Sequence, residues 1–148
     1  MNVILKPLLI LILLISQSSI AQNTEIDFAG NWIATDYWNN ESPLILSEDN
    51  YVSMSINGEF IDGKNFIIRG GKNDGKKGEL KYLINTDKSP IEIDLIAILD
   101  DEEKGRILGI IQPINDNEFL MTLSFDGVRD TNFDESANEN FIKVKREK

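Results

Sequence analysis

Three residues of this sequence could together perform acid–base chemistry: Tyr82, Asp94 and Arg129. A carboxylate can accept a proton, a phenol can donate one, and a guanidinium can stabilise negative charge. The sequence contains no histidine and no cysteine, which excludes Ser-His and Cys-His catalysis, thiol redox chemistry and nearly all zinc, copper and iron sites. No other catalytic constellation is recognisable. We therefore expect a protein that is not an enzyme and that uses no cofactor and no metal.

Two orientations of Asp94 are open from the sequence, because it lies in a long strand-like run with apolar neighbours. Directed into the interior of a sheet, its carboxylate needs hydrogen bonds or a cation, which Tyr82 or Arg129 could supply. Directed outward, it is a solvated surface aspartate. We favour the outward orientation.

Aromatic and sulfur-containing side chains are the other candidates for binding. Tyr37 and Trp38 are followed by two asparagines, and phenol and indole rings suit sugar-like or apolar ligands. Packing in the core or at the rim is an equal alternative for this pair. Trp32, Met54 and Met121 are expected to line an interior, which binds a small ligand only if an open pocket remains there.

Two loops approach known binding motifs and lack a required residue. Residues 70–77 nearly form a phosphate-binding loop, but Lys77 stands where Ser or Thr must hold magnesium, and no helix is expected to follow. Asp130, Asn132 and Asp134 stand at alternating positions, as the first oxygen ligands of a calcium loop do, but Phe141 occupies the position of the bidentate glutamate. We interpret both segments as solvated loops.

The elements that position these residues are predicted to be strands. Apolar and polar residues alternate in short runs separated by turn-forming clusters, and helical spacing is never sustained for three turns. Eight strands are expected: residues 30–35, 51–56, 65–69, 80–84, 91–99, 106–112, 119–125 and 141–145. Residues 44–46 and 59–61 are weaker candidates. Residues 100–105 are expected to form a charged turn, and Pro113 is expected to end a strand. Short turns favour an antiparallel meander, which closes on itself to remove exposed edges.

The first of these runs begins with Gly30-Asn31-Trp32, a Gly-x-Trp sequence that resembles the lipocalin signature. In lipocalins the tryptophan closes one end of the barrel, and a basic side chain near the chain end packs over it. Four side chains of the present sequence are candidate covers: Arg129, Lys143, Lys145 and Arg146.

The second half of the chain adds to this resemblance. Residues 78–82, 89–95, 109–110 and 119–120, with Arg129, are similar to a lipocalin-like family first noted as an uncharacterised domain of planctomycetes. Ile111 stands where that family has a tyrosine, and Asp130 where it has a proline. The resemblance covers about half of the mature chain and implies a fold without a particular activity. We expect an all-β protein: a single antiparallel, up-and-down, lipocalin-like barrel of about eight strands with little or no helix.

The first 21 residues have the layout of an export signal. Lys6 precedes an apolar run, residues 8–15, and the small residues Ser19 and Ala21 stand at the positions that a signal peptidase reads. The run is shorter than the roughly 20 residues that cross a bilayer. We predict a signal peptide, residues 1–21, and a lipocalin-like β-barrel domain, residues 22–148. The domain is expected in the periplasm or outside the cell, without an integral membrane span.

The net charge of the domain limits the classes of partner that it can bind. The chain has 15 basic and 25 acidic residues, and removal of Lys6 with the signal leaves 14 and 25, a net charge of −11. Such a surface repels phosphate backbones, so no nucleic acid is expected as a partner. We expect an exported domain that binds a small apolar or sugar-like ligand in or at the mouth of the barrel. The alternatives are a structural or protein-interaction module with a filled barrel, contacting another exported protein, and a hydrolase or isomerase using carboxylates.

Overall fold

The computed structural model describes residues 25–134 and 138–148. The predicted export signal, residues 1–21, lies outside this part of the chain. Among the residues described, no helix is long and apolar enough to cross a membrane.

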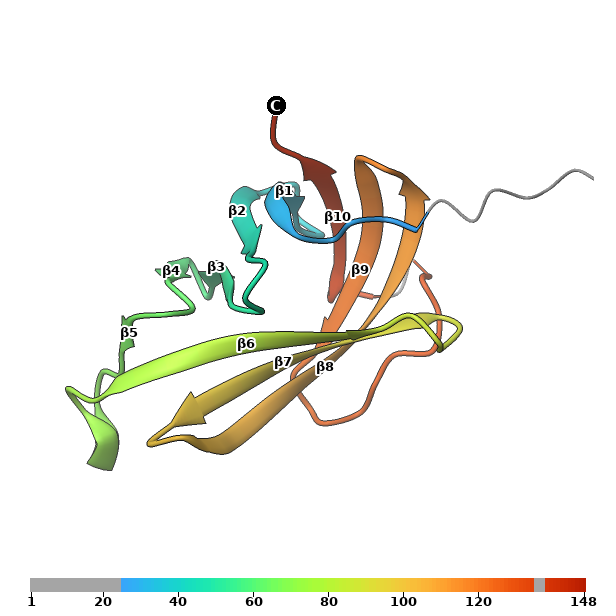
Figure 1. Cartoon of the computed structure of the whole chain (residues 1–148). Helices are drawn as coiled ribbons and strands as arrows, with labels where there is room; N and C mark the ends of the chain where they lie inside the picture. Colours follow the sequence, from blue (N-terminus) through green and yellow to red (C-terminus); the bar gives the residue numbers. More distant parts are fainter. Residues whose placement is uncertain (1–24, 135–137) are drawn as a thin grey trace, which may run out of the picture.

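The described part of the chain is all-β, as the alternating pattern predicts, and it contains ten strands (Figure 1). They are β1 (Gly30–Thr35), β2 (Glu41–Leu46), β3 (Val52–Ile56), β4 (Glu59–Ile61), β5 (Phe66–Ile67), β6 (Lys77–Asn85), β7 (Ile91–Leu99), β8 (Glu102–Asn115), β9 (Glu118–Ser124) and β10 (Phe141–Arg146). One 3-10 helix, η1 (Gly71–Asn73), is the only helical element in the described part of the chain.

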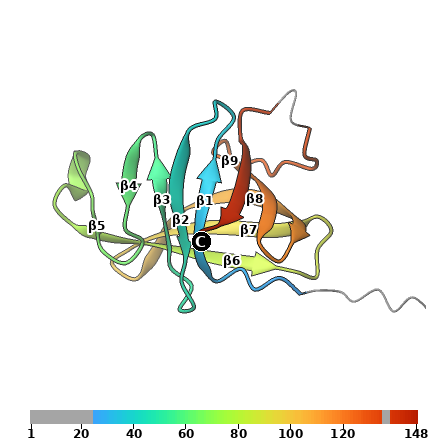
Figure 2. The same cartoon turned by 90° about the horizontal axis from the view of Figure 1, so that it is seen from above.

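The strands form one antiparallel sheet in the order β4-β3-β2-β1-β10-β9-β8-β7-β6-β5. Every pair of neighbours is consecutive in the sequence except β1 and β10, where Trp32 lies opposite Arg146. The meander therefore returns its last strand to its first. Figure 2 shows β1, β2, β3 and β4 crossing over β6 and β7, so that the strongly twisted sheet folds over a shared interior.

The barrel closes along a seam between β3 and β6. Tyr51 pairs with Lys81 across the seam, and the Leu80 N–H donates to the Gly63 carbonyl oxygen at 2.8 Å. This nearly closed arrangement confirms the predicted up-and-down barrel, with ten strands where about eight were expected. Two of the ten, β2 and β4, correspond to the two weaker candidates.

The predicted charged turn at residues 100–105 is wrong in its length. Only Asp100 and Asp101 form the turn, and Glu102 already begins β8. Both turn residues have positive φ, 52° and 60°, which is the backbone that a tight two-residue hairpin turn requires. Because aspartate adopts this conformation less readily than glycine, the sequence signal for a two-residue turn is faint.

Pro113 does not end a strand, contrary to the prediction. It lies within β8 opposite Phe119 of β9, and β8 continues for two more residues. The pairing of β8 with β7 stops at Ile111, so Pro113 has a neighbouring strand on one side only. Proline has no backbone N–H to donate, and its absence is tolerated here as it is in an edge strand.

The core fills one end of the barrel. The Trp32 ring is fully buried and packs edge to face against the Phe119 ring, with 4.8 Å between ring centroids. Phe28 also packs edge to face against the Phe119 ring, at 5.5 Å. The fully buried side chains around them are Leu44, Leu46, Val52, Ile93, Leu95, Met121, Leu123 and Val144. Burial of these large apolar groups is the main favourable contribution to folding.

Candidate functional site

Trp32 seals the end of the barrel where the two ends of the domain meet. Its indole Nε1–H donates to the Phe28 carbonyl oxygen at 2.9 Å, and the Arg146 guanidinium lies over the ring, 4.0 Å from the centroid. Arg146 also donates to three backbone carbonyl oxygens of the neighbouring segments. Of the four predicted covers, Arg146 is therefore the one that packs on Trp32.

Met54 and Met121, predicted to line a ligand site together with Trp32, belong to the packed core. They are 8% and 2% exposed, and neither lines the cavity described next. The barrel is thus filled around these two residues, where the sequence left open whether a pocket remains.

The opposite end of the barrel holds a cavity of about 370 Å³, hereafter the mouth cavity. β1 begins at the sealed end, where Gly30 lies opposite Leu46. β3 runs away from that end, so its last residue, Ile56, lies at the mouth. The cavity is lined by Ile56, Asn57, Glu59, Ile61, Phe66, Leu80, Ala97 and Ile107. Its volume falls within the range of small-molecule sites.

The lining residues were not predicted as a site, although a signal for two of them exists. The alternation of β3 and β7 places Ile56 and Ala97 on the inward faces of their strands, at the ends rather than in the middle. One wall depends on a glycine: a Cβ on Gly78 would come within 2.4 Å of the Phe66 ring. Gly78 therefore leaves room for the tip of the Phe66 ring next to β6, where Phe66 lines the cavity.

Tyr37 and Trp38 stand on the turn between β1 and β2, away from the lining of the mouth cavity. Their rings pack edge to face at 5.5 Å, and they are 42% and 61% exposed. The Asp36 carboxylate fixes the turn by accepting the backbone N–H of Trp38 at 2.9 Å. The pair forms an exposed aromatic surface rather than a wall of the cavity.

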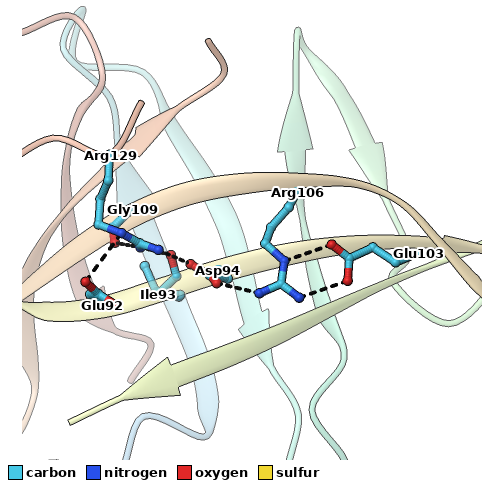
Figure 3. Close-up of polar contacts among 7 residues, drawn as sticks. All are labelled: Glu92, Ile93, Asp94, Glu103, Arg106, Gly109 and Arg129. Atoms are coloured by element: carbon cyan, nitrogen blue, oxygen red, sulfur yellow. Dashed lines mark hydrogen bonds and ion pairs between the residues drawn. The ribbon is translucent and has the colours of Figure 1, made fainter. Parts of the chain in front are cut away.

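Asp94 lies on the outer face of β7 and does not point into the barrel (Figure 3). Its carboxylate accepts from Arg129 Nη2 at 2.7 Å and from Arg106 Nη1 at 2.8 Å. Its side chain is only 13% exposed. The favoured outward orientation is correct, but the aspartate is paired rather than solvated. Arg106 was missed because the predicted six-residue turn would pair it with Leu99, whereas the shorter turn pairs it with Ile96.

Arg129 fastens the segment that follows β9 to the outer face of β7 and β8. It donates to the Gly109 carbonyl oxygen at 2.7 Å and to the Ile93 carbonyl oxygen at 3.3 Å, and its Nε lies 3.6 Å from a Glu92 carboxylate oxygen. Figure 3 shows these groups converging on one guanidinium. Beneath the fastened segment, Ile110 and Thr122 are buried on the outer face. Arg129 thus covers a second, smaller core.

Arg106 extends this network toward solvent. Its Nε and Nη2 donate to the two carboxylate oxygens of Glu103 at 2.9 and 2.8 Å. The Glu103 hydrogen bonds, and then those of Asp94, raise the pKa of Arg106, and the same Arg106 contact lowers the pKa of Glu103. Both shifts favour the charged forms, so the contact is an ion pair rather than a proton-transfer pair.

Tyr82 lies on the opposite face of the sheet from Asp94. It is paired with the inward-facing Leu95, and its hydroxyl donates to the Ser47 carbonyl oxygen at 2.8 Å across the barrel seam. Asp94, Tyr82 and Arg129 therefore do not converge in one cleft. The acid–base set proposed from the sequence is not assembled by this fold.

The titration of Tyr82 predicts how stability depends on pH. Burial raises the pKa of its phenol above the ordinary value of 10.0, so the folded chain keeps this proton to higher pH than the unfolded chain. The contribution of Tyr82 to the free energy of unfolding is therefore present below about pH 10, and it is lost as the pH rises through the pKa of Tyr82 in the folded chain. Urea unfolding should show that Tyr82→Phe costs about 1 kcal/mol at pH 7. The variant should lose less stability than the natural protein above pH 10. An equal alkaline loss in both proteins would contradict this assignment.

The contacts of Arg129 predict a second stability effect. Arg129→Ala should lower the free energy of unfolding by about 2 kcal/mol, because it leaves Asp94 with one ion-pair partner and removes two hydrogen bonds to backbone carbonyl oxygens. Subtilisin should then cleave within residues 125–134 more rapidly. Arg69→Ala is the matched control, since the Arg69 side chain is 82% exposed and lies 3.8 Å from its partner. Equal effects of the two substitutions would show that Arg129 does not fasten this segment.

A wider depression of about 740 Å³ lies beside the sealed end, outside the core. It is formed by the segment before β1 and by the turns after β6 and β8, and much of its lining is polar, including Asp87, Lys88 and Asp116. Although larger, it is less apolar: five of its twelve lining residues are apolar, against six of eight in the mouth cavity. The mouth cavity is the better candidate for binding because its walls come from the inner face of the barrel.

Comparison of the chain with protein-family models, with curated proteins and with solved structures gives no match. The resemblance to the lipocalin-like family therefore stays a prediction from the residues, and the candidate function is argued from the geometry of the barrel.

Proposed function

We propose that this protein is an exported lipocalin-like domain that binds a small apolar molecule in the mouth cavity. The observation that supports the proposal is the asymmetry of the barrel. One end is sealed by Trp32 under Arg146, and the other holds a cavity in which six of the eight lining residues are apolar. A barrel that served only as a packed scaffold would gain stability by filling this space with side chains.

The lining favours an apolar ligand over a sugar-like one. A sugar buried in a cavity needs hydrogen-bond partners for its hydroxyl groups, and only Asn57 and Glu59 bring polar side chains to this lining. The aromatic pair Tyr37 and Trp38 is not part of it. An alkyl chain, by contrast, gains about 0.8 kcal/mol for each methylene group moved from water into such walls.

A substitution that fills the cavity tests this function. Ala97→Phe places a ring among the lining residues and should weaken the binding of N-phenyl-1-naphthylamine, a neutral fluorescent apolar probe, by at least about tenfold. Leu83→Phe is the matched control, because Leu83 lies on the outer face of β6 and is 54% exposed. Circular dichroism of both variants verifies the fold, and Ala97→Leu is the smaller change if Ala97→Phe does not fold.

The outcomes of this experiment are distinct. Full probe binding by a folded Ala97→Phe protein would place the binding site elsewhere and overturn the proposal. Absence of probe binding by the natural protein would do the same, and would favour the alternative of an interaction module. That alternative has one supporting observation: the exposed pair Tyr37 and Trp38, together with Phe125 and Val128, which are 63% and 67% exposed.

A further inference from the structure

The mouth cavity carries one charged side chain among its lining residues, the carboxylate of Glu59. Glu59 begins β4, directly after the Asn57-Gly58 turn, and its side chain is 64% exposed. The apolar walls lie on one side of this carboxylate and solvent on the other. A ligand with its apolar part in the cavity would therefore carry its head next to Glu59.

The present partner of Glu59 is weakly held. Arg69 Nε lies 3.8 Å from Glu59 Oε1, and the Arg69 side chain is 82% exposed. An exposed ion pair at this separation contributes little, because water screens both groups and the long side chain loses entropy when fixed. A cationic head group could replace Arg69 at Glu59, whereas an anionic head group would face the carboxylate.

The net charge of the chain acts in the same direction. The β7–β8 turn brings four consecutive acidic residues, 100–103, to this end of the barrel. Three of these four are paired with basic side chains: Asp100 with Lys76 at 3.1 Å, Glu102 with Lys104, and Glu103 with Arg106. With the net charge of −11 expected for the mature chain, the long-range field attracts cations.

We infer that the ligand is a cationic amphiphile, such as an alkylamine, whose tail lies in the mouth cavity and whose ammonium group lies at Glu59. This inference rests on the proposed function and adds the chemical class of the ligand to it. It also assigns Glu59 as the residue that selects the head group.

Three ligands with the same decyl tail and different head groups distinguish apolar binding in the mouth cavity from head-group selection by Glu59. Decylamine, decanol and decanoate are compared at pH 7 and low salt by displacement of N-phenyl-1-naphthylamine from the natural protein. Decylamine should bind up to about fivefold more tightly than decanol, as an exposed ion pair allows, and decanoate should bind more weakly than decanol. Added salt should reduce the preference for the amine.

Glu59→Gln should remove the preference for the amine, so that decylamine and decanol bind the variant with similar affinity. Glu48→Gln is the matched control, since it removes the same charge from the exposed turn between β2 and β3. If both substitutions lower decylamine binding equally, or if decanoate binds as tightly as decylamine, the head-group assignment is overturned while apolar binding stands. If none of the three ligands displaces the probe, the proposed function itself fails.

Discussion

Replacing Trp32 with alanine is expected to lower the free energy of unfolding by about 3 to 5 kcal/mol, the range for removal of a large buried aromatic side chain. Trp32 is fully buried and contacts Phe119 on one side and the Arg146 guanidinium on the other. Its loss would leave a cavity at the sealed end and would also remove the hydrogen bond to Phe28. Urea unfolding followed by circular dichroism measures the change.

Trp38→Ala provides the matched control for this substitution. Trp38 is 61% exposed, so the same change of residue type should alter stability by no more than about 0.5 kcal/mol. Trp32→Phe should fall between the two, because a phenyl ring fills part of the space but cannot donate to the Phe28 carbonyl oxygen. A Trp32→Ala protein as stable as Trp38→Ala would refute the description of Trp32 as the seal of the barrel.

Gly63→Ala is expected to cost about 3 kcal/mol or more, since it introduces overpacking against backbone that cannot move aside easily. A Cβ on Gly63 would lie 2.1 Å from the Val52 carbonyl oxygen and 2.8 Å from the Leu80 carbonyl oxygen. These atoms belong to the two strands that meet at the barrel seam, β3 and β6. The substitution should therefore separate the seam as well as lower global stability.

Amide hydrogen exchange can locate that effect. The Leu80 N–H donates to the Gly63 carbonyl oxygen, so its exchange should accelerate more than exchange within the β8–β9 pair. Gly105→Ala is the control: Gly105 lies in β8, has no positive φ, and a Cβ there would meet open space. The free energy of unfolding of that variant should be unchanged or higher by up to about 1 kcal/mol. Similar losses in the two variants would contradict the role of Gly63 in closing the barrel.

The strands were predictable where alternation is strong and turns are short. The expected ranges 30–35 and 91–99 coincide with β1 and β7, because buried and exposed side chains must alternate along a strand with one face in the core. The return of β10 to β1 was anticipated only indirectly, through the basic side chain expected over Trp32. Register between distant strands depends on packing across the whole sheet, and a local pattern does not encode it.

The candidate site was much less predictable. Met54 and Met121 have the alternation of inward-facing residues, but alternation does not tell a side chain that fills a barrel from one that lines a cavity. That distinction depends on which strands face each other across the interior. The partner of Asp94 was predicted in part: Arg129 was named, and Arg106 was missed because a two-residue turn of aspartates resembles a longer charged loop.

The most direct test of a binding mouth opposite a sealed end is a methyl NMR titration of the natural protein with decanol. The isoleucine methyl groups of Ile56, Ile61 and Ile107 line the mouth cavity, whereas Ile114 lies in the depression beside the sealed end. Binding as proposed shifts the first three signals together and gives contacts between their methyl groups and the decyl chain, while the Ile114 signal stays in place. Shifts confined to Ile114, or no shift at any of the four residues, would contradict this account.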